Sequence, residues 1–290
     1  MKPLACITLG TLLAMSAASP AADPETVYFP SADGRTELVG YLFKPAKGAS
    51  RAAVVMLHGR SGPYRSTVKE DCKRVARGVE SPCGAATLSG RHVQWGEFWA
   101  ARGYLALHVD SFGPRGKGHG FGRFTHGNPD RADVNEISVR PLDAEGAYAW
   151  LSKREDVAAG RVFLQGWSNG GSTALNVMHR QKAGAAGYRA ALSFYPGCGP
   201  KALVDTRLAA GAPVSVLLGG ADEEVSPRTC RSAIEDAKSR GMPIDFTWYD
   251  GAAHDFDNPL EARQAVEANR QAREASMRHA EAFFQSFLAR

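Results

Sequence analysis

Gly166-Trp167-Ser168-Asn169-Gly170 reads as Gly-x-Ser-x-Gly and stands between two contrasting segments of the chain. The apolar run Arg161–Gln165 precedes it and predicts a buried strand, whereas Gly171–Met178 predicts a helix. A strand, a sharp turn with serine at its tip and a helix form the setting of a nucleophile elbow. The flanking glycines suit that turn, because it is strained and leaves no room for side chains. The stretch therefore predicts a reactive serine, Ser168, at the end of a strand.

Strands and helices are expected to alternate through most of the chain. A hairpin, Thr26–Phe29 with Leu38–Leu42, should come first. Other expected strands are Ala52–Leu57, Tyr104–Val109, Ala190–Phe194, Val214–Leu218 and Ile244–Tyr249, and expected helices are Trp95–Arg102, Ile137–Lys153, Pro227–Ser239 and a long one from about Leu260. This alternation predicts an α/β fold with a mostly parallel central sheet flanked by helices on both faces. No linker or internal repeat interrupts it, so residues 23–290 are interpreted as a single domain.

Two segments are too long to be plain connections between these elements. Arg60–Val93 and Ser111–Asn135 each follow the C-terminal end of an expected strand, the side on which open α/β sheets bind ligands. Long connections are usually functional loops, so we interpret both as insertions that shape a binding site. The glycines of Gly116–Gly122 do not form Gly-x-Gly-x-x-Gly before a helix, which argues against a nucleotide site.

Composition and the N-terminal residues limit the classes of function. The net charge of +5 comes from scattered lysines and arginines, so nucleic-acid binding is not predicted. Lys2, the apolar stretch Leu4–Met15 and the small residues Ser16–Ala22 are typical of a signal peptide, which we place at about residues 1–22. No later segment is apolar enough for a membrane span. The mature chain is therefore expected to be periplasmic or secreted.

Four cysteines remain once Cys6 is assigned to the signal peptide. An even number in an oxidising compartment favours two disulfides, with three possible connectivities. We favour Cys72–Cys83, which would close an insertion, and Cys198–Cys230, whose cysteines both follow expected strands. Zinc is not expected, because no spacing resembles Cys-x-x-Cys and His119 and His126 lack a nearby carboxylate or cysteine at ligand spacing.

Ser168 needs a base and an acid that orients the base. Asp222 stands at the tip of the expected strand Val214–Leu218, and His254 follows the strand Ile244–Tyr249. The order serine, acid, histidine is that of α/β-hydrolases, and all three residues fall at the same edge of the sheet. We therefore predict Ser168, Asp222 and His254 as a catalytic triad.

Four other acids lie near Asp222 and His254 in the sequence, and the reaction also needs N–H donors. Glu223 and Glu224 are interpreted as solvated neighbours of the acid, and Asp255 and Asp257 rank below Asp222 because a sequence neighbour rarely faces the same histidine ring. The tetrahedral intermediate needs two backbone N–H donors. The residue after the nucleophile, Asn169, should supply one. The loop His58-Gly59-Arg60-Ser61 should supply the other from the Arg60 amide, with Ser61 as second choice.

The chain resembles the dienelactone hydrolase family of the α/β-hydrolase superfamily. The resemblance is carried, over nearly all of the mature chain, by Leu107–Gly116 (LHVDSFGPRG), Gly166–Gly171 (GWSNGG), Leu218–Pro227 (LGGADEEVSP) and Trp248–Phe256 (WYDGAAHDF). It implies an α/β-hydrolase fold and a triad in which Ser168 stands where relatives often carry cysteine. It also implies that Arg115 lies close to one of the arginines that hold the namesake's substrate carboxylate. The second such position holds Asp257 and Asn258 instead.

These observations predict an exported serine hydrolase that cleaves carboxylic esters of small molecules without a cofactor. Arg115, Trp167 and Tyr64 are candidates for substrate contacts, and Arg123, His119 and His126 could add to a cationic wall. Trp95, Phe98 and Trp99 are assigned to the core face of a helix. Alternatives are a dienelactone or other lactone hydrolase, a peptidase or amidase of the prolyl-oligopeptidase type, and a binding protein without activity. No oligomeric state is predicted.

Overall fold

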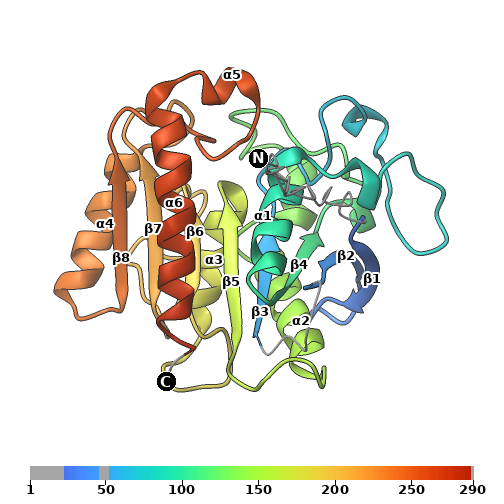
Figure 1. Ribbon diagram of the computed structural model, residues 1–290, viewed down its shortest axis with the longest axis horizontal. Helices are drawn as coiled ribbons and strands as arrows, with labels where there is room; N and C mark the ends of the chain where they lie inside the picture. The colour runs from blue at the N-terminus through green and yellow to red at the C-terminus, as the bar shows by residue number, and fades with distance from the viewer. Residues whose placement is uncertain (1–22, 46–51, 289–290) are drawn as a thin grey trace, which may run out of the picture.

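The computed structural model describes residues 23–45 and 52–288 and contains one eight-stranded sheet (Figure 1). The strand order is β1-β2-β4-β3-β5-β6-β7-β8, with β1 and β2 antiparallel and every pair from β4 to β8 parallel. The strands are β1 (Glu25–Pro30), β2 (Glu37–Phe43), β3 (Ala52–Leu57), β4 (Tyr104–Asp110), β5 (Val162–Trp167), β6 (Ala191–Phe194), β7 (Val214–Gly219) and β8 (Ile244–Tyr249). The predicted hairpin and mostly parallel sheet are confirmed.

Helices cover both faces of this sheet. Figure 1 shows α1 and α6 in front of the strands, with α2 and α3 behind them. The helices are α1 (Gly90–Ala101), α2 (Arg140–Ser152), α3 (Asn169–Arg180), α4 (Pro227–Ser239), α5 (Glu261–Gln264) and α6 (Glu267–Gln285). Two hydrophobic clusters follow from this arrangement, one beneath α2, α3 and α4 and the other beneath α1 and α6.

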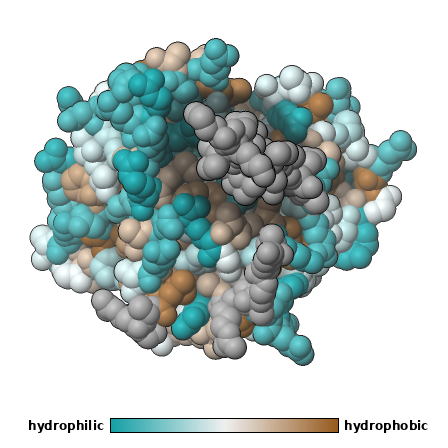
Figure 2. Space-filling view, viewed as in Figure 1, coloured by the Kyte–Doolittle hydropathy of each residue, from teal (hydrophilic) through white to brown (hydrophobic). Residues whose placement is uncertain are grey.

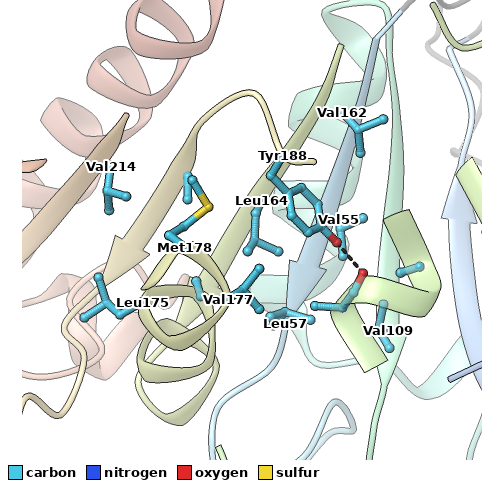
Figure 3. Close-up of a cluster of buried hydrophobic side chains, with 14 of the residues drawn as sticks. Val55, Leu57, Val109, Val162, Leu164, Leu175, Val177, Met178, Tyr188 and Val214 are labelled. Carbon is cyan, nitrogen blue, oxygen red and sulfur yellow. Dashed lines mark hydrogen bonds between the residues drawn. The ribbon is translucent and has the colours of Figure 1, made fainter. Parts of the chain in front are cut away.

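The central strands are buried along their whole length, and β3 is apolar at every position because both of its faces are buried. In β3, Val55 and Leu57 join the cluster on the α2–α3 side, whereas Val54 and Met56 join the cluster beneath α1 and α6. This alternation is the two-residue period of a strand. Figure 3 shows the first cluster, in which the Tyr188 hydroxyl donates to the Ala144 carbonyl oxygen at 2.5 Å. A phenol in an apolar core thus has its hydrogen bond satisfied.

Three helices depart from the sequence prediction. Helix α1 begins at Gly90, five residues before the predicted start. The prediction began too late because the first turn is mostly polar and shows no apolar period. Helix α2 begins at Arg140, since Pro141, which has no N–H, fits the first turn. The predicted terminal helix is broken into α5 and α6, and the fully buried side chain of Asn269 bonds across the break to the Arg263 carbonyl. The break thus leaves an amide side chain beside the loop that carries His254.

Before the next α-helix begins, the two predicted insertions contain short 3-10 helices and one isolated β-bridge, between Tyr64 and Leu88. The 3-10 helices are Lys69–Asp71, Ala85–Thr87, Gly113–Arg115 and Pro129–Val134. The insertions contact each other, since the Val75 amide donates to the Gly113 carbonyl and the Gly118 amide to the Lys73 carbonyl, both at 3.0 Å. They therefore support each other beside the C-terminal ends of β3 and β4.

Both predicted cysteine pairs are joined, Cys72 to Cys83 and Cys198 to Cys230. The second bond ties the segment after β6 to α4. Two disulfides are typical of a protein from an oxidising compartment. The predicted signal peptide lies outside the described residues. Within the part of the chain that the structure describes, no helix has the length and apolar character to cross a membrane. Figure 2 shows one face covered mostly by hydrophilic residues, with hydrophobic ones scattered among them.

Removing the longer disulfide should destabilise the fold more than removing the shorter one. Cys198 and Cys230 are 32 residues apart, against 11 for Cys72 and Cys83. Loop-closure entropy then predicts losses of about 4 and about 3 kcal/mol in the free energy of unfolding. Both losses can be measured by urea unfolding of the wild type and of two variants, one with Cys198 and Cys230 changed to alanine and one with Cys72 and Cys83 changed to alanine. Unchanged unfolding midpoints, or the reverse order, would contradict this account.

Candidate active site

Ser168 occupies the turn between β5 and α3 with φ +53° and ψ −115°, a region that residues with side chains rarely adopt. A Cβ on Gly166 would lie 2.1 Å from the Gly170 carbonyl oxygen, and a Cβ on Gly170 would lie 2.1 Å from the Leu57 carbonyl oxygen. Only glycine fits at either position. The elbow geometry predicted from the sequence is therefore present, and the Ser168 amide is held by the Phe194 carbonyl at 2.9 Å.

The structure brings Ser168, His254 and Asp222 together. His254 Nε2 lies 3.0 Å from Ser168 Oγ, and His254 Nδ1 lies 2.8 Å from Asp222 Oδ2. These distances allow the imidazole to accept the serine proton while the carboxylate fixes the ring. Glu224, one of the competing acids, has its Oε2 3.7 Å from His254 Nε2 and is paired with Arg60. It faces the serine side of the ring.

Asp222 is held by its own loop, whereas the His254 loop is held by neighbouring segments. Asp222 Oδ1 accepts hydrogen bonds from the Glu224 and Val225 amides, at 2.8 and 2.9 Å, which leaves Oδ2 for the histidine. The His254 amide donates to Glu223 Oε2 at 3.0 Å. The preceding amide, that of Ala253, donates to the side chain of Asn269 at the break between α5 and α6. The broken terminal helix thus helps to fix the histidine loop.

Tyr195 and Arg91 also line the site, and neither was predicted. The Tyr195 ring centroid is 4.7 Å from that of His254, and its hydroxyl donates to Asp257 and accepts from Arg91. The fully buried Asp257 carboxylate also accepts from the indole N–H groups of Trp95 and Trp167, both at 2.8 Å. Asp257 is therefore a buried structural acceptor behind the site. Tyr195 directly follows β6, the strand beside β5, and this position in the sequence could have marked it as a residue of the site.

Two adjoining hollows lie at the site, and Ser168 lines the smaller of them. A cavity of about 60 Å³ is lined by Gly59, Arg60, Ser61, Arg91, Trp167, Ser168, Tyr195, Glu224, His254 and Asp255. A groove of about 450 Å³ shares Ser61, Arg91 and Asp255 with it and extends over the first insertion to Leu260. Within the small cavity the cations are paired, Arg60 with Glu224 and Arg91 with Asp255. The immediate surroundings of the serine are thus close to electrically neutral.

Comparison with known proteins identifies the family. The model of the dienelactone hydrolase family matches residues 97–288. The chain belongs to the dienelactone hydrolase family. Among solved structures, one described as m3DLH is similar with a TM-score of 0.65 at 20% identity, covering 92% of this chain and 99% of that one. A dienelactone hydrolase-like promiscuous phosphotriesterase, P91, from metagenomic libraries has a TM-score of 0.62 at 17% identity, covering 92% and 99%.

A thermophilic esterase from Thermogutta terrifontis, solved with propionate bound, has a TM-score of 0.58 at 18% identity and covers 92% of this chain and 96% of that one. At these identities the likeness concerns the fold, which is the predicted α/β-hydrolase fold. The dienelactone hydrolase family is a family of hydrolases, and esterases are among the solved structures similar to this chain.

The residues proposed for substrate contact lie in different places in this family member. Trp167 lines the small cavity, and the buried Tyr64 lines the groove and donates to Asp110 at 2.7 Å. Arg115 does not line either hollow. Its guanidinium donates to both oxygens of the buried Asp143, at 2.8 and 2.9 Å, and lies 3.4 Å from Asp33. This dienelactone hydrolase relative therefore uses Arg115 to join the second insertion to α2.

The other basic residues of the second insertion are mostly paired with acids. Arg123 contacts Glu223 and Glu224 at the rim of the site, at 3.4 and 2.7 Å. His126 pairs with Glu136 at 3.1 Å. His119 packs against the Phe121 ring. Trp95, Phe98 and Trp99 lie in the core beneath α1, as expected. The insertion of this dienelactone hydrolase family member thus reaches the site through Arg123.

Three buried histidines, His58, His92 and His108, lie close together at the start of the His58–Ser61 loop of this dienelactone hydrolase relative. His108 lies between His58 and His92, with ring centroids 6.1 and 4.2 Å away. Burial lowers the pKa of His58 and His108 well below the usual value, and it lowers the pKa of His92 to about 3. All three rings are therefore neutral at pH 7. The Ser111 amide donates to His58 Nε2 at 3.3 Å, which makes Nε2 an acceptor.

The depressed pKa of His92 should appear as a loss of stability in acid. An unfolded histidine binds its proton near pH 6.5, whereas the folded one does so near pH 3, so stability falls as the pH drops below 6.5. At pH 4.5 this one residue should lower the free energy of unfolding by about 3 kcal/mol. His92→Asn keeps a donor for the Pro63 carbonyl and removes the titration. Urea unfolding at pH 7.0 and 4.5 should show a smaller loss of unfolding free energy in the variant than in the wild type. Equal losses in the two proteins would refute the prediction.

Proposed function

We propose that this protein is an exported serine hydrolase that cleaves carboxylic esters through Ser168, His254 and Asp222. The observation that carries the proposal is the continuous set of contacts from Asp222 Oδ2 to His254 and from His254 Nε2 to Ser168 Oγ, at 2.8 and 3.0 Å. Membership of a hydrolase family supports it. The two disulfides support export, because such bonds persist in oxidising compartments such as a periplasm.

In the proposed reaction His254 takes the Ser168 proton as Oγ attacks the ester carbonyl carbon. Asp222 orients the ring and stabilises the imidazolium that forms. The histidine then gives its proton to the departing alcohol, which leaves an acyl group on Ser168. Water, deprotonated by the same histidine, releases the acid and restores the serine. No cofactor takes part in this sequence.

The negative charge of the tetrahedral intermediate is proposed to rest on two backbone N–H groups, those of Arg60 and Asn169. Asn169 is the first residue of α3, so its N–H belongs to a helix N-terminus, which favours negative charge. Arg60 lines the cavity beside Ser168. Its side chain is tied to Glu224 and to the Phe121 carbonyl, and its own carbonyl accepts from the Phe121 amide. These bonds support a fixed direction for its N–H.

The proposed substrates are esters with a small group on one side of the carbonyl. The cavity at Ser168 measures about 60 Å³, room for little more than an acetyl or propionyl group, and the groove of about 450 Å³ can take the larger part. Lactones are a second candidate, favoured by the family alone. The namesake's need for a free arginine is not met by Arg115, which is bound to Asp143.

A panel of aryl esters from acetate to octanoate tests the proposal on the purified protein. The acetate and propionate should be hydrolysed fastest, with kcat/KM falling as the acyl chain lengthens. A fluorophosphonate probe should label Ser168, which a binding protein without activity would not allow. Amides of the same acids should react far more slowly, and comparable rates would favour the peptidase alternative. Absence of both turnover and labelling would overturn the proposal.

A further inference from the structure

One buried guanidinium contacts both backbone segments that are proposed to supply the N–H donors. Arg140 is the first residue of α2, and its side chain is fully buried. One of its terminal nitrogens, Nη2, donates to the His58 carbonyl oxygen at 2.8 Å, and the other, Nη1, donates to Asn169 Oδ1. His58 begins the loop that continues to Arg60, and Asn169 directly follows Ser168. Arg140 therefore bridges the two halves of the proposed oxyanion site.

The two segments are packed so closely that small shifts matter. A Cβ on Gly59 would lie 3.5 Å from Ser168 Cβ, and a Cβ on Gly170 would lie 2.6 Å from the His58 carbonyl oxygen. No side chain separates the loop from the elbow. The distance between the two N–H groups thus depends on what holds these backbones against each other. Arg140 bonds to the backbone carbonyl of His58 on one side and to the side-chain oxygen of Asn169 on the other.

The buried charge of Arg140 is attracted by Asp143, Glu136 and Asp110, and its guanidinium carbon lies 5.1 Å from the centroid of the Phe112 ring, but within the described chain it has no direct ion pair. Across residues 23–45 and 52–288 the structure gives Arg140 no ion pair within 4 Å, since Asp143 is engaged by Arg115 and Glu136 by Arg131. Its Nε is buried without a partner. Burial lowers the pKa of Arg140 to about 10, so the group stays charged at neutral pH. Desolvating a charge costs several kcal/mol, and buried ion pairs can often be replaced by well-packed apolar side chains without loss of stability.

We propose that Arg140 is a positioning residue of the active site, which fixes the Arg60 and Asn169 amides at the spacing that the oxyanion requires. The inference rests on the function proposed above. Arginine is suited to this role because its planar fork presents two donors at a fixed separation to two different acceptors. Lysine carries the same charge on one nitrogen and cannot reproduce that separation. The contribution of Arg140 should therefore appear in the chemical step and not in substrate binding.

Arg140→Lys tests the proposal with the charge retained. We expect kcat for an aryl acetate to fall by about 100-fold, the usual effect of misplacing catalytic groups by about 1 Å, while KM changes little. The matching thionoester is the decisive readout, because a developing sulfur anion gains less from N–H donors than an oxygen anion. Its kcat should fall much less than that of the ester. Arg131→Lys is the matched control, a buried arginine paired with Glu136, and should keep wild-type rates on both substrates.

Each outcome decides one question. A wild-type protein without esterase activity would overturn the proposed function and leave nothing for Arg140 to position. With an active wild type, an unchanged kcat in Arg140→Lys, or equal losses on ester and thionoester, would overturn the role of Arg140 alone. If Arg140→Lys does not fold, Asn169→Ala replaces it, since it removes the Oδ1 acceptor and keeps the Asn169 N–H. The same ester-selective loss is then expected, and an equal loss on both substrates would overturn the inference.

Discussion

Ser168→Ala should lower kcat for aryl acetates by about a millionfold, close to the loss seen when a serine nucleophile is removed from a complete triad. The reason is that Oγ is the attacking atom and lies 3.0 Å from the base, with no other hydroxyl in hydrogen bond with His254 Nε2 in the described chain. Hydrolysis rates measured with freshly purified variant and wild type, together with fluorophosphonate labelling, give the result. The variant should take no label.

The control for this change is Ser172→Ala. Ser172 lies one turn further along α3, is buried, and donates to the Gly197 carbonyl at 3.0 Å without contact to the imidazole. It should keep labelling and turnover, with a loss of about 1 kcal/mol in the free energy of unfolding from its hydrogen bonds. Retention of activity in Ser168→Ala would contradict the proposed mechanism. Loss of activity in both variants would instead point to a disturbed elbow helix.

The strands and the elbow could be predicted because their signals are local. The run Ala52–Leu57 is apolar at each position, since both faces of β3 are buried, and its predicted bounds match the structure. Ser168 is marked by its glycines, which the close backbone contacts at Gly166 and Gly170 require. Asp222 and His254 could be placed because parallel strands bring their C-terminal ends to the same edge of the sheet.

The remaining parts of the site depend on contacts that no local pattern reveals. Arg91 was missed because the first turn of α1 is polar and was not predicted as helix. The partners of Arg140 are 29 and 82 residues away in the chain, so nothing near it in the sequence marks its role. The sequence suggests Asp257 only as an alternative acid for the neighbouring histidine and as a departure from an arginine of the family's namesake. Its actual partners, two indoles and Tyr195, come from α1, β5 and the end of β6.

Asp222→Asn should lower kcat by about ten-thousandfold, the effect expected when the orienting carboxylate becomes an amide and the imidazole is held in the wrong tautomer. Asp222 is the natural choice because its Oδ2 contacts Nδ1 at 2.8 Å, while Oδ1 is occupied by the Glu224 and Val225 amides. The asparagine can keep those backbone contacts through its oxygen and would then present N–H to Nδ1. Esterase rates of variant and wild type across pH 6 to 9 measure the loss.

Glu224→Gln provides the contrast that separates the two acids. Burial raises the pKa of Glu224, but His254 and the paired Arg60 outweigh this and leave the pKa below its usual value, so the group is ionised at neutral pH. Its Oε2 is 3.7 Å from Nε2, the nitrogen that must exchange a proton with Ser168, and so it cannot orient the ring through Nδ1. We therefore expect a loss of about tenfold or less, arising from the weakened contact with Arg60. A larger loss than that of Asp222→Asn would assign the role of the acid to Glu224, and with it a different tautomer of His254.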